Sequence, residues 1–350
     1  MPIHYPKGEQ RTQELTRMDP QMQERLMTYA GFIPGTIAMV LLLAAWYFHA
    51  FKASRTDLDD DLLEEEADEP RPVSPGPRWL LPILLAVGVA GADYAINDGF
   101  QMWPDSNNDR FTHAILLIAL VGVAEGLVKL PLFVAFAMRL LAYAGAFWML
   151  TEGYTEVVLG STANLIGYTL AAALATALVA TAADRNAVKN HHDRKLGWLD
   201  ALTWVMIMGA IMPVSLKNEF AIGSMLPAGI IAVMVSATIV GLVFSSFSIA
   251  RGGISTLAGF VMMIFAGICV QAELTNLPSV LLAMLLPLVT TIPLVTESRI
   301  RRLIARAILI GVVGGSAALF AFQPTQVFGD PAGEDGEQVE SLDDYYNNLD

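Results

Sequence analysis

The amino-acid sequence predicts an all-α integral membrane protein, a polytopic bundle of about ten transmembrane helices with short loops. Its 350 residues are 54% hydrophobic and only 16% charged, with a mean hydropathy of +0.50, whereas a soluble domain is about one quarter charged. Long apolar segments recur along the chain. They lack the period-two alternation of barrel strands, and backbone groups in lipid must bond internally, so these segments should be helices.

Each predicted membrane span follows from its length. A helix needs about 20 mainly apolar residues to cross a hydrocarbon core of roughly 30 Å. The ten segments that satisfy this are residues 29–51, 79–96, 111–128, 132–151, 162–183, 198–214, 222–244, 253–270, 277–295 and 304–322.

The remaining residues form polar segments around the predicted spans. Residues 1–28 are polar and we expect them to be partly helical, since Asp19-Pro20 resembles an N-cap followed by proline at the first helical position. Residues 52–77 are an acidic, proline-rich linker, and 323–350 are an acidic tail. The linker and the tail carry half of the 34 acidic residues, and we expect both to be disordered because they cannot bury a core. The bundle of about nine further helices then occupies residues 78–322.

The distribution of Lys and Arg predicts the orientation of the chain. Connections after the odd-numbered spans carry 14 basic residues, and the opposite side carries six. The positive-inside rule therefore places both termini outside the cytoplasm. The single cysteine and the excess of Arg over Lys, 15 against 6, favour a prokaryotic cytoplasmic membrane.

Glu125 and Arg139 are the first candidate functional pair, because an ionisable group at membrane depth must be compensated. The short turn at Lys129-Leu130-Pro131 folds the third and fourth spans into a hairpin, so Arg139 should reach Glu125. The pair is either part of a solute pathway or a structural staple of the hairpin.

Asp93 and His113 form a second candidate pair. Asp93 comes late in the second span and His113 early in the third, so both should lie at similar depth near the outer surface. A carboxylate that orients an imidazole is typical of a proton relay, and the alternative is an interfacial hydrogen bond.

Pro287, Thr290, Thr291 and Pro293 are the candidates for a helix break in the ninth span. Broken helices expose backbone groups that form solute sites in transporters. Proline and threonine also occur in membrane helices without that role, so this assignment too has a structural alternative.

Two other charged groups have simpler interpretations. Asp200 begins the sixth span, where an acid is favoured by the helix dipole. Arg299, Arg302 and Arg306 share one helical face and are expected to contact anionic headgroups.

Several site classes find no support in the sequence. One cysteine excludes a cysteine-built metal or disulfide framework, and no nucleotide, hydrolase, metalloprotease or haem motif occurs. His191-His192-Asp193 is flanked by basic residues that would repel a cation. We therefore predict no catalytic residue, no cofactor and no metal, and hence no enzyme.

Two functions remain open. The first is a secondary transporter or permease for a small solute, which uses the polar candidates above. The alternative is a noncatalytic membrane subunit or scaffold of a larger complex. The expected partners are the lipid bilayer and a membrane-protein partner or a second copy of the chain, with no nucleic acid. Packing against such a partner would use small-residue pairs such as Gly31/Gly35, Gly122/Gly126 and Gly311/Gly315, which permit close helix approach.

Overall fold

The computed structural model describes residues 24–60, 76–97, 107–152, 161–194, 196–218, 224–271, 276–293 and 298–322, and in these parts the chain is helical without strands. The first segment begins with a π-helical stretch, η1 (Leu26–Phe32). The helices that follow are α3 (Ile33–Asp60), α4 (Leu80–Asn97), α5 (Asn107–Leu127), α6 (Leu132–Thr151), α7 (Thr162–Arg194), α8 (Gly197–Lys217), α10 (Pro227–Val243), α11 (Gly253–Gln271), α12 (Leu277–Ala283), the 3-10 helix η4 (Leu286–Thr291) and α13 (Arg299–Phe322).

Seven of the described helices are long and apolar enough to cross a membrane, and three shorter apolar helical segments accompany them. This composition supports a multi-pass membrane protein. The short segments are the predicted spans at 222–244, 253–270 and 277–295, of which the last is interrupted between α12 and η4.

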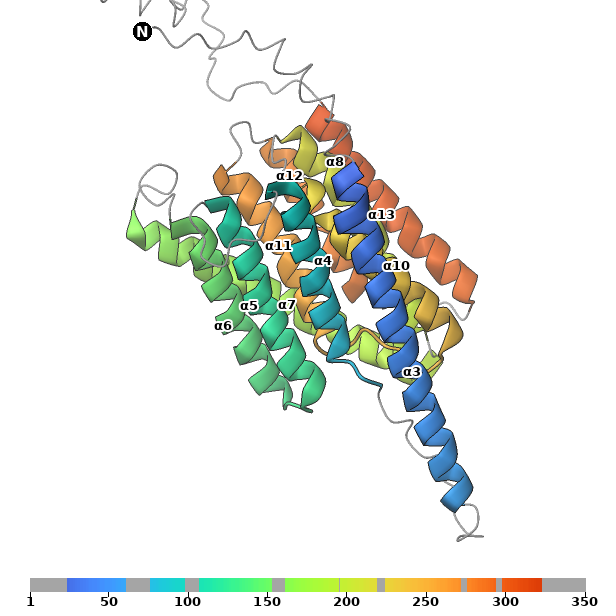
Figure 1. The fold of residues 1–350 in the computed structure, drawn as a ribbon. Helices are drawn as coiled ribbons and strands as arrows, with labels where there is room; N and C mark the ends of the chain where they lie inside the picture. Colours follow the sequence, from blue (N-terminus) through green and yellow to red (C-terminus); the bar gives the residue numbers. More distant parts are fainter. Residues whose placement is uncertain are drawn as a thin grey trace, which may run out of the picture.

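The helices pack as a bundle in which α6, α5, α4 and α3 lie side by side along one face (Figure 1). Behind this row, α10 packs against α3, α4 and α8, while α11 packs against α5 and α7. α13 lies against α8 and α12. Every residue from 253 to 265 is buried, which is expected for a helix that is apolar all round and enclosed by protein.

Close helix contacts depend on glycine at a few positions. α4 and α10 cross where Gly88 meets Gly229, and a Cβ on Gly88 would lie 2.6 Å from the Gly229 carbonyl oxygen. Only two glycines facing each other permit this separation.

Two helices extend well beyond the ends predicted from the sequence. α3 continues to Asp60 and α7 continues to Arg194, because polar residues extend a helix without a stop signal as it leaves the apolar run. Consequently the first residues of the predicted linker are helical. The rest of that linker (61–75), residues 1–23 and the tail at 323–350 lie outside the described residues.

Candidate functional site

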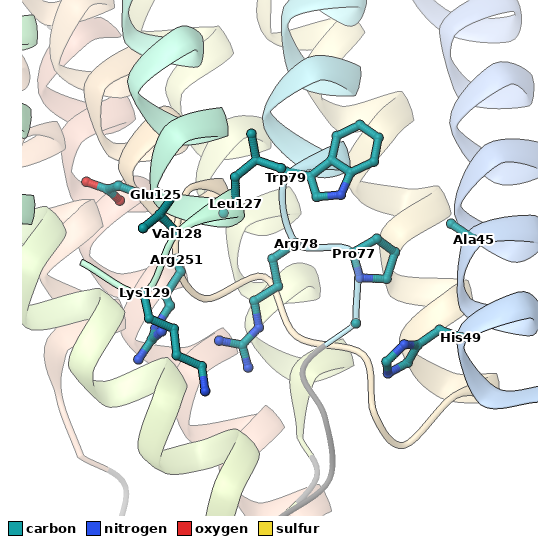
Figure 2. A pocket seen from close by; sticks show the side chains of 12 residues that line it. Ala45, His49, Pro77, Arg78, Trp79, Glu125, Leu127, Val128, Lys129 and Arg251 are labelled. Atoms are coloured by element: carbon teal, nitrogen blue, oxygen red, sulfur yellow. The ribbon is translucent and has the colours of Figure 1, made fainter. Parts of the chain in front are cut away.

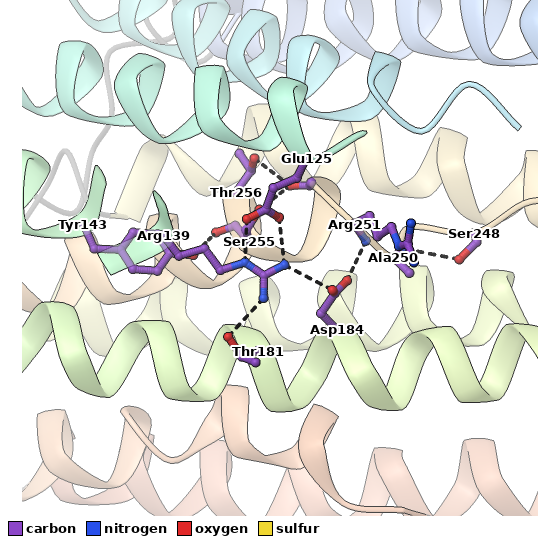
Figure 3. A network of polar contacts seen from close by, with 11 residues as sticks. Glu125, Arg139, Tyr143, Thr181, Asp184, Ser248, Ala250, Arg251, Ser255 and Thr256 are labelled. Carbon is purple, nitrogen blue, oxygen red and sulfur yellow. Dashed lines mark hydrogen bonds and ion pairs between the residues drawn. The ribbon is translucent and has the colours of Figure 1, made fainter. Parts of the chain in front are cut away.

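The candidate site is built around a bidentate ion pair between α5 and α6. Arg139 Nε donates to Glu125 Oε1 and Arg139 Nη2 donates to Glu125 Oε2, each over 2.7 Å (Figure 3). The two residues are 1% and 3% exposed. The contact predicted from the hairpin is therefore present, and it has the two-bond geometry in which a guanidinium binds a carboxylate most strongly.

α7 contributes two further partners to Arg139. Asp184 Oδ2 lies 3.1 Å from Arg139 Nη2, and Thr181 Oγ1 accepts a bond of 3.1 Å from Nη1. Residues three apart on a helix share a face, so Thr181 and Asp184 approach the guanidinium together. One cation thus joins three helices.

The turn between α10 and α11 closes the network from the other side. The backbone N–H of Arg251 donates to Asp184 Oδ1, and Arg251 has a φ of +57°. Gly252 follows with a φ of +88° and lies against the carbonyl of Gly122 on α5, so a Cβ there would collide with backbone. This turn therefore requires glycine at position 252.

Ser255 and Tyr143 complete the hydrogen bonding around the pair. The Ser255 hydroxyl donates to Glu125 Oε2 over 3.1 Å, and the Tyr143 hydroxyl donates to the Ser255 carbonyl over 2.7 Å. Both side chains are buried. The acceptors of Glu125 are thus engaged by Arg139 and Ser255.

A cavity of about 520 Å³ opens next to this network. Its charged lining residues are Arg78, Lys129, Arg251 and Glu125, and the His49 imidazole also lines it. Figure 2 shows the Arg78, Lys129 and Arg251 side chains converging, with Glu125 turned to the other side. We call this end of the molecule, which carries Arg78, Lys129 and Arg251, the basic end of the bundle.

Arg78, just before α4, is a partly buried cation that lies close to a second cation, Arg251. Burial and the neighbouring Arg251 cation lower its pKa, and Asp184 partly opposes this effect. Its Nε atom is buried and has no hydrogen-bond partner among the described residues.

A second buried ion pair links α8 and α13. Arg306 Nη1 donates to Asp200 Oδ1 over 2.6 Å and to Thr203 Oγ1 over 2.8 Å. Arg302 and Arg306 are each 2% exposed, so the expectation that they contact headgroups is wrong, whereas Arg299 is exposed. Asp200 does occupy the first turn of α8, and it also attracts Arg306 inward because a buried carboxylate needs a counter-charge.

The predicted helix break is present in the ninth segment. α12 ends at Ala283 and a 3-10 helix resumes at Leu286, so Pro287, Thr290 and Thr291 all lie in η4, and Pro293 follows it. The Thr290 and Thr291 hydroxyls donate to the carbonyls of Pro287 and Leu288 over 2.6 and 2.7 Å.

η4 is attached to α7 through one amide side chain. Asn186 Nδ2 donates to the carbonyl of Thr290 over 2.7 Å and to that of Ile292 over 3.5 Å. Asn186 lies two residues after Asp184 on the same helix, so α7 contacts both the ion network and the broken segment.

Asp93 and His113 lie on the neighbouring helices α4 and α5. Asp93 is buried and accepts a 2.9 Å hydrogen bond from Asn97 within its own helix. His113 is half-buried. A relay role for these two residues stays a prediction.

Sequence reasoning missed several members of the network, namely Asp184, Asn186, Tyr143 and Ser255. Asp184 falls just beyond the apolar run at 162–183 and therefore reads as part of a loop. The available signal was its spacing of three residues from Thr181, which places both on one face if the helix continues.

The described residues contain no group of three His, Cys, Asp or Glu side chains that could hold a metal ion. No family model, curated protein or solved structure matches the chain.

Proposed function

We propose that the chain is a secondary transporter or permease for a small solute, with α12 and η4 as the moving element. One observation carries this proposal: the ninth apolar segment is broken between α12 and η4, and α7 contacts it through Asn186, two residues away from Asp184 of the ion network. Discontinuous helices at such positions expose backbone groups that can bind a solute.

The broken segment is suited to movement for a physical reason. Proline at 287 lacks an N–H, and the Thr290 and Thr291 hydroxyls return their bonds to carbonyls within η4. Four of the six residues of η4 are buried, so its movement would exchange packing contacts with α7, α8 and α13. Movement of η4 would disturb Asn186 and, through the rigid α7, the position of Asp184.

The proposal is tested by reversibly linking η4 to α7. In a background with Cys269, the only cysteine, replaced by serine, Lys189→Cys and Ile292→Cys place thiols on the two elements. Lys189 lies one helical turn after Asn186, and both chosen positions are exposed. A short thiol-cleavable cross-linker then joins them in proteoliposomes loaded from a mixture of small metabolites, whose uptake is measured by mass spectrometry under an imposed ion gradient.

We expect at least one solute to accumulate above protein-free vesicles, to fall to that level after cross-linking, and to recover after reduction. The two single-cysteine variants treated with the same reagent should keep uptake. No uptake of any solute, or uptake that cross-linking leaves unchanged, would contradict the proposal.

A noncatalytic membrane subunit is the second candidate, and two observations favour it. The network charges are paired within the chain, as are Asp200 and Arg306. Gly311 and Gly315 on α13 are exposed, and a Cβ at either would meet no atom within 4 Å. Gly122 and Gly126, by contrast, pack against other segments of this chain.

Gentle purification from native membranes followed by native mass measurement distinguishes the candidates. A subunit would be recovered with a stoichiometric partner, and Gly311→Leu with Gly315→Leu would release that partner if α13 is the contact face. A lone monomer or homodimer would favour the transporter.

A further inference from the structure

Three cations meet at the basic end, each two residues beyond the end of a different helix. Arg78 precedes α4, which begins at Leu80; Lys129 follows α5, which ends at Leu127; and Arg251 precedes α11, which begins at Gly253. All three line the same cavity of about 520 Å³, and their charged ends converge (Figure 2).

The charges of this cluster are not balanced by the lining. Glu125 is the one carboxylate among the cavity residues, and Arg139 and Ser255 already engage its oxygens. Asp184 is likewise shared between Arg139 and the Arg251 backbone. Like charges held together repel unless an anion lies between them, and burying part of Arg78 adds to that cost.

One buried hydrogen-bond donor of the Arg78 guanidinium, its Nε–H, has no acceptor among the described residues. This nitrogen is shielded from solvent, and unsatisfied buried donors are rare in folded proteins. The N-termini of α4 and α11 lie beside the same cavity and add partial positive charge, which the C-terminus of α5 partly offsets.

We propose that this cavity binds a phosphate group, held by Arg78, Lys129 and Arg251. Each of the two guanidinium groups can donate two parallel hydrogen bonds to a pair of phosphate oxygens, and the lysine ammonium adds a compact positive charge. The inference does not rest on transport, because a binding site of this kind fits a subunit as well as a permease.

The phosphate group can belong to a lipid or to a free solute. The cations lie just outside apolar helices, at the level that headgroups occupy if those helices span a bilayer. The cavity also has room for a small phosphate-bearing solute, since ligand pockets typically measure about 300–1,000 Å³.

The test uses the full chain in neutral detergent with two probes. Inorganic phosphate is titrated against chloride at equal ionic strength and followed by calorimetry, and retention of phosphatidylglycerol is compared with that of phosphatidylcholine by native mass spectrometry. The variants are Arg78→Gln with Arg251→Gln, and separately Lys129→Gln. Arg301→Gln, which removes an exposed cation at the start of α13, is the matched control.

We expect binding of at least one probe that weakens about tenfold or more in the Arg78/Arg251 variant, weakens in Lys129→Gln, and stays unchanged in Arg301→Gln. Phosphate binding without lipid preference identifies a free solute, and phosphatidylglycerol retention without phosphate binding identifies a headgroup. Binding of neither probe, or equal loss in Arg301→Gln, would overturn the proposal. Lys129 is exposed, so its variant should fold and keeps the test decisive even if the double variant does not.

Discussion

Arg139 is the residue on which the ion network converges, and its contacts give it a structural role whatever else it does. Its guanidinium binds Glu125 on α5 and Asp184 on α7 from a position on α6. Removing one member of a buried ion pair leaves an uncompensated charge, which typically costs about 3–5 kcal/mol.

Arg139→Ala should therefore destabilise the folded chain by about 3–5 kcal/mol and reduce its accumulation in the membrane. The thermal midpoint in detergent and the quantity of membrane-inserted protein measure this effect. Arg301→Ala serves as the control, since Arg301 is exposed. Normal accumulation of Arg139→Ala would assign the residue to function instead.

The contribution of the Glu125–Arg139 ion pair to stability can be measured separately from the cost of burying each charge. Glu125→Gln combined with Arg139→Gln should destabilise less than the sum of the two single substitutions, because neither charge is then left alone. Thermal midpoints of the four proteins give the coupling. Additive losses would show that the bidentate contact contributes little.

The sequence supplied part of this site. Glu125 and Arg139 could be paired because a short turn fixes the geometry of their hairpin. Asp184 and Arg251 could not, since their contacts join segments far apart in the chain, and a single sequence contains no information on which helices are neighbours. Arg302 and Arg306 illustrate the same difficulty. Their spacing predicted that they share one helical face, but only the packing of α13 against α8 shows that this face points into the protein.

α12 and η4 together form the least regular element of the described bundle. The residues Pro287, Thr290 and Thr291 predicted a break, and the structure places it slightly earlier, after Ala283. Pro287 has no N–H to donate to the carbonyl of Ala283, four residues earlier, and its ring crowds that carbonyl. The α-helical hydrogen bonds therefore end at Ala283, and the chain continues with 3-10 bonds such as that from the Leu288 N–H to the Leu285 carbonyl. Sequence patterns locate such breaks only to within a turn.

Asn186→Ala should loosen η4. Loss of the amide removes a hydrogen bond to the Thr290 carbonyl, worth about 1 kcal/mol, and hydrogen exchange should accelerate across 284–293 while α11 remains protected. Asn164→Ala on the same helix is the control, since it lies at the opposite end of α7. Unchanged exchange in η4 would show that Asn186 does not hold it.

The turn between α10 and α11 should tolerate no side chain at position 252. Gly252→Ala forces a Cβ against the Gly122 backbone at a positive φ, so we expect a loss of stability of about 1–3 kcal/mol. Gly209→Ala is the matched control because a Cβ there meets nothing within 4 Å. The comparison is made by thermal denaturation, and equal midpoints for the two variants would contradict the packing described here.

The architecture of the whole molecule can be predicted from amino-acid composition more directly than any single site can. Long apolar segments predicted a helical multi-pass bundle, and seven of the described helices have the length and composition to span a membrane. The order in which they pack depends on small-residue contacts such as Gly88 with Gly229, which apolar periodicity does not reveal.

Orientation is a prediction for the molecule as a whole. If the positive-inside rule applies, a C-terminal alkaline phosphatase fusion expressed in bacteria should be active and a C-terminal green fluorescent protein fusion dark. Fusions placed after residue 194 should give the opposite pattern. A fluorescent C-terminal fusion would reverse the assignment and place the basic end outside.

Movement of η4 relative to α7 can be tested through a distance distribution, without knowledge of the solute. Spin labels at Lys189→Cys and Ile292→Cys, in the Cys269→Ser background and in lipid nanodiscs, are measured by pulsed electron resonance with a metabolite mixture present or absent. If η4 moves, we expect two resolved distances whose populations shift when the mixture is added. A single narrow distance that no condition alters would contradict it and leave the chain as a static membrane subunit.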